Sequence, residues 1–216
     1  MKPFASAALF CAAAALLSAQ SAPLPADIDP QTFSRLPLIP RAQLDANGQR
    51  IYDAVMGKDA PAPRLGPPAT SLHSIVVAEP YDALNQALRK SVITSHYFEL
   101  CTLIAAREFD SEYEWSGHEP GALRAGVPQN VIDAVRNNRD TAGLPEKDAL
   151  VIRYGRELFR RHKIDSALYS KVVEQFGRQG MVDLTLSLGD YAMTAFLLNA
   201  VDQHVAPGRA VNLPMK

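Results

Sequence analysis

Hydrophobic residues recur at helical spacing along most of the chain. Residues three or four positions apart lie on one face of a helix, whereas strands alternate apolar and polar positions. Leu84 and Leu88 share one such face, and Leu150, Tyr154 and Leu158 share another. No alternating pattern of useful length occurs. The pattern therefore predicts an all-α fold with about seven helices.

Glycine and proline predict where several of these helices begin and end. A first helix is expected from Leu44 to Met56, before Gly57. Gly126 is expected to stop a later helix, because glycine is the residue most tolerant of the left-handed backbone at a helix C-terminus. Pro128 and Pro145 are expected in the first turns of the helices that follow.

The last long segment is predicted to be the core helix. Ser166 is a candidate N-cap for a helix that ends at Gly177. After it, Met181 to Val201 is apolar on nearly every side, which is typical of a helix surrounded by neighbours. Asp183, Asp190 and Asn199 interrupt this apolar segment, and buried polar groups need partners.

The N-terminus has the three regions of a secretory signal peptide, predicted over residues 1–21. One lysine, Lys2, precedes an uncharged apolar run from Phe4 to Leu17, and the small residues Ala19 and Ser21 indicate cleavage after Ser21. The alternative is a retained membrane anchor. This run is shorter than the ~20 apolar residues that span a bilayer. We therefore expect an exported, periplasmic or secreted protein with no stable membrane anchor after cleavage.

The mature chain is expected to divide into three parts. Residues 22–41 contain five prolines and are predicted to form an extended arm over the surface. Residues 42–205 are predicted to form the helical domain, and residues 206–216 a C-terminal tail.

Composition places the chain among globular proteins. Of its 216 residues, 47% are hydrophobic and 21% charged, and the net charge is −1. No basic excess exists to bind a phosphate backbone, so a nucleic-acid partner is not expected. Of two cysteines, Cys11 lies in the signal peptide, which leaves Cys101 as a lone thiol in the exported protein. We expect Cys101 to be a small buried hydrophobe.

The candidate chemistry lies between Glu99 and His118. On a helix that starts near Ser111, the side chains of Ser111, Glu114 and His118 form one column, with Trp115 beside it. Glu99 lies on the preceding helix, and an antiparallel return would bring it near that column. A carboxylate beside an imidazole fixes its tautomer and raises its pKa, and an apolar neighbour such as Trp115 raises the pKa of a carboxyl group. The alternative is an ordinary surface pair of Glu114 and His118.

This stretch resembles the carboxymuconolactone decarboxylase-like family, which includes alkyl hydroperoxidase D. Its peroxidase branch carries Glu, eleven residues, Cys, two residues, Cys, three residues and His. The same frame here has Glu99, Ser111, Glu114 and His118, so the glutamate and histidine are in register and both cysteines are replaced. The Glu-Trp-x-x-His pattern at Glu114 to His118 is similar to the branch without the redox pair. The resemblance extends, less specifically, from about Gln43 to Leu198.

The resemblance implies an all-helical homotrimer or homohexamer with a pocket near a subunit interface. It implies carbon–carbon lyase activity that needs no cofactor and no metal. Loss of CO2 from a lactone acid leaves a dienolate, whose oxyanion must be stabilised and whose carbon must receive a proton. His118, paired with Glu114 or Glu99, is the expected proton donor, and Ser111 a hydrogen-bond donor to substrate. Arg107 and Arg124 are expected to be surface cations.

Export changes the expected substrate. The lactone of aromatic-ring catabolism arises inside the cell, so an exported protein would meet another small molecule, such as another lactone, an enolisable carboxylic acid or a lignin-derived aromatic. An alkyl hydroperoxidase D-like peroxidase is disfavoured, because serine and carboxylate cannot replace the attacking and resolving thiols.

Two further alternatives are open. His96, Glu99, Glu114 and His118 offer two imidazoles and two carboxylates, a set that suits iron, manganese or zinc. The other is a non-catalytic periplasmic protein that binds a ligand or assists assembly. The remaining histidines, His73, His162 and His204, are scattered and are expected to be structural.

Overall fold

The computed structural model describes residues 24–215 and is all-helical over that range. Its only strand-like feature within these residues is an isolated bridge between Asp29 and Ser34. The all-α prediction is confirmed, and eight α-helices take the place of the seven expected. The predicted signal peptide, residues 1–21, lies outside the described residues. In chain order the elements are η1 (Arg41–Gln43), α1 (Ala46–Met56), α2 (Pro67–Ser71), α3 (Ile75–Leu88), α4 (Ser95–Glu108), α5 (Glu112–Arg124), α6 (Gln129–Arg136), α7 (Glu146–Arg161) and α8 (Ser166–Ala200).

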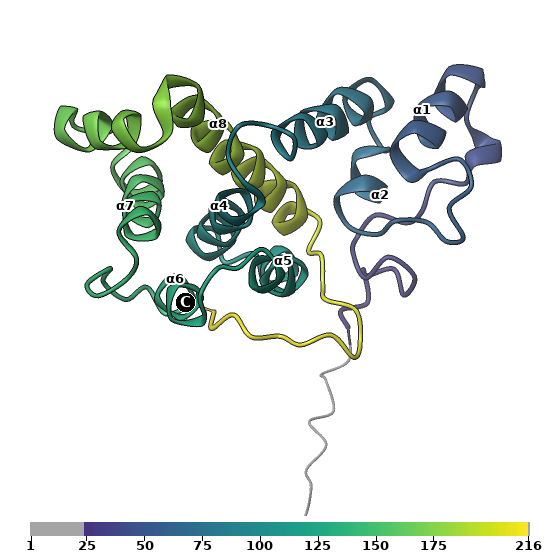
Figure 1. Cartoon of the computed structure of the whole chain (residues 1–216). Coiled ribbons are helices and arrows are strands. Elements are labelled where there is room, and N and C mark those ends of the chain that lie inside the picture. The colour runs from purple at the N-terminus through teal and green to yellow at the C-terminus, as the bar shows by residue number, and fades with distance from the viewer. Residues whose placement is uncertain (1–23, 216) are drawn as a thin grey trace, which may run out of the picture.

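Helix α4 is the centre of the fold. Every residue from Phe98 to Arg107 is buried, because α5, α7 and α8 pack around this helix and α6 lies against it. Figure 1 shows α4 enclosed by these neighbours. Burial on all sides explains why α4 has no clear polar face. It also means that a polar side chain on α4, such as Glu99, lies inside the molecule.

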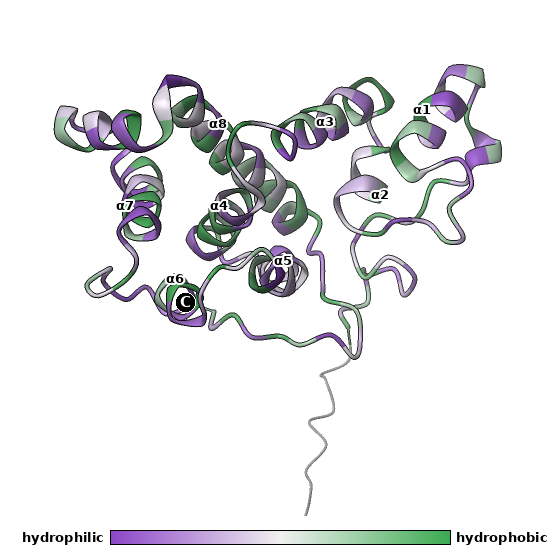
Figure 2. Cartoon of the chain, in the orientation of Figure 1, coloured by the Kyte–Doolittle hydropathy of each residue, from purple (hydrophilic) through white to green (hydrophobic). Residues whose placement is uncertain are grey.

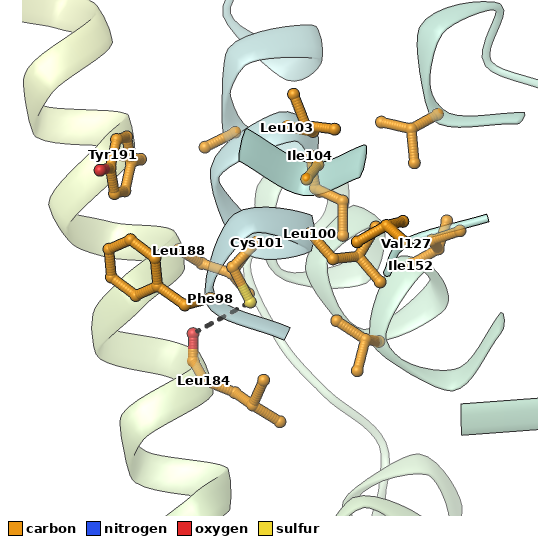
Figure 3. Close-up of a cluster of buried hydrophobic side chains, with 14 of the residues drawn as sticks. Phe98, Leu100, Cys101, Leu103, Ile104, Val127, Ile152, Leu184, Leu188 and Tyr191 are labelled. Atoms are coloured by element: carbon orange, nitrogen blue, oxygen red, sulfur yellow. Dashed lines mark hydrogen bonds between the residues drawn. The ribbon is translucent and has the colours of Figure 1, made fainter. Parts of the chain in front are cut away.

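The C-terminal half of α8 supplies the second wall of the core. Phe98 and Cys101 of α4 face Leu184, Leu188 and Tyr191 of α8 (Figure 3). This half of α8 is coloured largely for hydrophobic residues in Figure 2. Cys101 is fully buried here, with its sulfur 3.9 Å from the Leu184 carbonyl oxygen, as expected for a small core residue.

Helix α8 differs from the sequence prediction at its start and at Gly177. Its N-cap is Asp165, whose side chain accepts a hydrogen bond from the Leu168 N–H at 2.7 Å, rather than Ser166. Gly177 has φ 70° and ψ 174°, a backbone conformation open almost only to glycine, and it bends the helix instead of ending it. Among the described helices, α8 alone is long and apolar enough to cross a membrane, and half of its most apolar window is buried in the fold.

A smaller group of helices, α1 to α3, packs beside the C-terminal half of α8 (Figure 1). Ile51, Val55 and Leu72 form the centre of its separate apolar cluster. Helix α1 begins two residues later than expected, because the Asp45 side chain caps it by accepting from the Gly48 N–H at 2.7 Å. Helix α2 is the additional element, in a segment whose prolines predict a break; prolines at its first two positions suit a helix start.

Both ends of the described chain pack against the domain. The arm predicted over residues 22–41 joins the end of α8, where the Arg35 N–H donates to the Val201 carbonyl and the His204 N–H to the Phe33 carbonyl. The C-terminal tail runs below α5 towards α6 (Figure 1), and Leu213 is buried in the main core. The tail predicted as separate from the domain therefore belongs to the folded unit.

Candidate active site

A cavity of about 240 Å³ opens between α2, α3, α5, the end of α8 and the C-terminal tail. Its volume suits a molecule of one ring with small substituents. Two residues of the predicted column, Glu114 and His118, line it. The other polar side chains on its wall come from six separate segments: Arg64, Ser71, Tyr81, Asp82, Asn85, Arg89, Tyr113, Tyr191, Thr194 and Arg209.

Glu99, His118 and Glu114 lie in a row, with a hydrogen bond between Glu99 and His118 and a longer contact between His118 and Glu114. Glu99 Oε2 of α4 lies 2.8 Å from His118 Nδ1 of α5, and His118 Nε2 lies 3.4 Å from Glu114 Oε2. A carboxylate can only accept, so Glu99 fixes the proton on Nδ1 and turns Nε2 towards Glu114. Glu99 does not line the cavity, so it holds the imidazole from behind. The expected antiparallel return of α5 onto α4 is present, because these helices pack along their length.

Glu114 is a carboxyl group held away from water. It is 3% exposed, and burial raises its pKa, while the charges of His118 and Arg89 oppose that effect. Burial disfavours the charged form of a carboxyl group, so Glu114 retains its proton to higher pH than a surface glutamate does.

Four residues from α3 and α8 form a polar network on the opposite wall. Arg89 Nη2 donates to the Tyr191 hydroxyl at 2.8 Å, and Asn85 Nδ2 lies 3.3 Å from the same oxygen. Asn85 Nδ2 also donates to Asp190 Oδ2 at 2.8 Å. Arg89 reaches Glu99 as well, with Nη1 3.6 Å from Oε1. The network therefore connects the cavity wall to the carboxylate behind His118.

Tyr191 is placed to donate a hydrogen bond into the cavity. Its oxygen accepts from Arg89 and Asn85, and its ring meets the His118 ring edge to face with centroids 5.0 Å apart. A phenol whose oxygen already accepts from two donors keeps its own O–H for a third partner. Burial raises the pKa of Tyr191, so that proton is retained at neutral pH.

Tyr113 is held at the mouth of the cavity by a close backbone approach. Its hydroxyl lies against Gly66, where a Cβ atom would come within 2.4 Å of the phenol oxygen. Gly66 also has φ 70°, which strains any other residue. The α1–α2 connection can therefore cover Tyr113 only because residue 66 is glycine.

Ser111 and Trp115 do not line the cavity. Ser111 is the N-cap residue of α5 and its hydroxyl is buried without a hydrogen-bond partner among the described residues. Trp115 is fully buried in the core, where its indole N–H donates to Glu119 Oε2 at 3.1 Å. A helix displaces successive side chains by about 100°, so Trp115 faces the core when Glu114 faces the cavity. The structure therefore assigns Trp115 to the core rather than to the substrate pocket.

The two arginines left out of the expected site behave differently. Arg124 lies in the exposed last turn of α5, as expected. Arg107 is 2% exposed, contrary to the expectation of a surface cation, and binds the Pro214 carbonyl and Asp110. Its contact fastens the C-terminal tail to α4.

Of the four residues considered as metal ligands, Glu99, Glu114 and His118 lie together, but His96 does not join them. His96 Nε2 lies 2.7 Å from Asp148 Oδ1 of α7, so this imidazole points away from His118. Within residues 24–215, no group of three or more histidine, cysteine or acidic side chains has the geometry of a metal site.

A likeness to a solved structure identifies the fold. No protein-family model matches the sequence, and no curated protein does. The chain is similar to a crystal structure of an alkylhydroperoxidase AhpD core, an uncharacterized peroxidase-related protein from Ralstonia eutropha JMP134, with a TM-score of 0.65. The chain has the alkylhydroperoxidase D fold. The match covers 81% of this chain and 93% of the other at 17% identity, so it establishes the fold alone.

Several cavity residues are absent from the sequence-based site. Asn85 and Arg89 are four residues apart, a spacing that places them on one face of α3. That spacing indicates a shared polar face on this helix, but nothing in the sequence showed that the face contacts Tyr191. Arg209 gave no signal at all, because it lies in an irregular tail.

Proposed function

We propose that this protein is an acid/base enzyme that catalyses decarboxylation or proton transfer on a small lactone or enolisable carboxylic acid, without an organic cofactor. The observation that carries the proposal is the chain from Glu99 through His118 to Glu114, whose last two members line a cavity of molecular size. Neighbouring titratable groups in different environments, one able to donate a proton and the other to accept it, are typical of acid/base sites.

Each group has a distinct role in this reaction. Loss of CO2, or loss of a proton to His118 Nε2, leaves an enolate on the substrate. Its oxygen accepts the O–H of Tyr191, which Arg89 and Asn85 polarise. The Glu114 carboxyl group delivers a proton to carbon, and His118 Nε2 receives or returns protons at Glu114. Glu99 is a positioning residue, because it holds the imidazole without facing the cavity.

A thiol peroxidase is not favoured for the described part of the chain. Cys101 is the cysteine there, and it is fully buried between α4 and α8. Burial raises the pKa of its thiol, which lowers the thiolate fraction that attack on a peroxide requires.

The test is turnover by wild type and His118→Gln on a panel of unsaturated lactone acids and enolisable aromatic acids. Proton-to-deuterium exchange is followed by NMR and CO2 release by mass spectrometry. We expect His118→Gln and Glu114→Gln each to lower kcat by about 100-fold or more, the usual scale for a lost acid or base. His73→Gln is the matched control, because that exposed ring binds only the Pro37 carbonyl outside the cavity.

The outcomes separate catalysis from binding. Turnover that survives His118→Gln would contradict the proposal. A binding protein would be favoured by two results together: wild type turns over no member of the panel, and both wild type and His118→Gln retain a bound ligand.

We also propose that the mature protein is exported and forms a homotrimer or homohexamer. The signal-peptide pattern at residues 1–21 supports export. An exposed apolar stripe on α8, formed by Val182, Leu186, Met193 and Phe196, supports self-association. These positions are four, seven and three residues apart, so they lie on one helix face.

A further inference from the structure

The cavity contains one arginine that has no carboxylate partner among the described residues. Three arginines line it, Arg64, Arg89 and Arg209. Arg89 is bound to Asn85 and Tyr191, with Glu99 nearby. Arg64 donates to the Val55 carbonyl at 2.7 Å and lies 3.7 Å from Asp82. Arg209 has no carboxylate within 4 Å among residues 24–215.

Neighbouring residues hold Arg209 in place without neutralising it. Its guanidinium lies 5.8 Å from the centroid of the Tyr113 ring, a cation–π distance. Gly117 directly precedes His118 in the chain. The Arg209 Nη2 atom lies 3.3 Å from the position that a Cβ atom of Gly117 would occupy. A fixed arginine with an unused charge is the side chain that best recognises a carboxylate.

The tail that carries Arg209 is fastened on both sides of it. Upstream, the His204 N–H donates to the Phe33 carbonyl and Gln203 Nε2 donates to the Thr32 carbonyl. Downstream, Leu213 is buried in the core and the Pro214 carbonyl accepts from Arg107. Residues 207–212 between these anchors are exposed. The tail is therefore a strap across α5 that brings one cation to the mouth of the cavity.

We propose that Arg209 binds a carboxylate of the substrate that is retained through the reaction, and that the C-terminal strap thereby selects carboxylate-bearing molecules. This inference rests on the proposed function for the identity of the reaction, but the binding itself does not require turnover. A carboxylate that departs as CO2 loses its charge, so a strong ion pair would oppose its departure. The carboxylate at Arg209 is consequently the one that stays.

Charge coupling supports this assignment. Glu114 is surrounded by His118, Arg89, Asp190, Arg209 and the phenols of Tyr81, Tyr113 and Tyr191. Burial raises the pKa of Glu114, and the positive charge of Arg209 opposes that rise. His118 and Arg89 oppose it more strongly, and a bound carboxylate that neutralises Arg209 would remove only the contribution of Arg209. Substrate binding would therefore favour the protonated Glu114 that the reaction uses.

The test compares binding of furan-2-carboxylate with that of furan-2-carboxamide, which has the same shape and no charge. Calorimetric titration of wild-type protein should show the carboxylate binding at least about tenfold more tightly, the scale of a charge-assisted hydrogen bond. Arg209→Ala should abolish that preference, and Arg209→Lys should keep part of it. Arg124→Ala, which removes an exposed arginine outside the cavity, should leave the preference unchanged.

Two results would overturn the inference: equal or undetectable binding of both probes by wild type, or a carboxylate preference that survives Arg209→Ala. His73→Gln, at an exposed ring outside the cavity, should keep the wild-type preference for furan-2-carboxylate. If the carboxylate preference holds while wild type turns over no acid on the panel, the proposed reaction fails and the carboxylate site stands.

Discussion

Two carboxyl groups of this protein, Glu114 and Asp190, are buried in the region of the cavity. Burial raises the pKa of both, and Asp190 Oδ1 has no hydrogen-bond partner among the described residues. A carboxyl group with a raised pKa binds its proton more tightly in the folded than in the unfolded chain. The free energy of unfolding then falls as pH rises from about 4.5 through the folded pKa, by up to about 1.4 kcal/mol per pH unit for each group.

Glu114→Gln should therefore flatten this dependence. The amide carries no charge to desolvate, so the variant should gain stability relative to wild type at pH 8 and gain little at pH 4. Asp190→Asn should act in the same direction. Urea denaturation at pH 4, 6 and 8 measures the effect, with the exposed Glu174→Gln as control. An unchanged slope in Glu114→Gln would show that folding does not raise the pKa of this carboxyl group.

Two of the three glycines in helix α8, Gly177 and Gly189, have opposite effects on it. Gly177 has φ 70° and ψ 174° and bends the helix. Gly189 lies in regular helix, and a Cβ there would meet nothing within 4 Å. Only the first is needed for its backbone conformation; the second lowers helix stability without a packing reason in the monomer.

Gly177→Ala should destabilise the protein by about 1–3 kcal/mol, the usual cost of a side chain in a glycine-only region. Gly189→Ala should instead stabilise it by about 0.5–1 kcal/mol. Chemical denaturation of both variants in parallel gives the comparison. If Gly177→Ala were neutral, α8 would be a straight helix in solution.

The exposed apolar stripe on α8 is a feature of the whole molecule. Leu186 and Met193 are 46% and 44% exposed, and Phe196 is 60% exposed. Side chains of this kind on one face of a long helix are usually covered by another chain.

We expect sedimentation of the mature protein to show a trimer or hexamer. Leu186→Glu combined with Met193→Glu should shift it to a smaller species, because two charges would be buried at each contact. Leu123→Glu, at an exposed apolar residue of α5 outside the stripe, should not. The proposed contact through this face of α8 would be contradicted if wild type were a monomer. It would also be contradicted if the two glutamates on α8 left the size of the assembly unchanged.

Local sequence signals predicted much of the fold. The end of α1 at Met56, the stop at Gly126 and the start of α7 after Pro145 follow from backbone chemistry that acts over a few residues. The bend at Gly177 was predicted as a helix end, because sequence shows where a helix is interrupted but not whether it resumes. Helix α2 was missed, because prolines suit both a break and a first turn.

The sequence by itself determined the all-helical class and placed Glu114 and His118 on one face of α5, because helical periodicity fixes which neighbours in the chain share a face. Only the tertiary structure decided that Trp115 belongs to the core, that Tyr191 and Arg89 face His118, and that Arg209 of the tail reaches the same cavity. Those residues lie on separate elements or in irregular chain, and the packing that brings them together depends on the whole fold rather than on any local pattern.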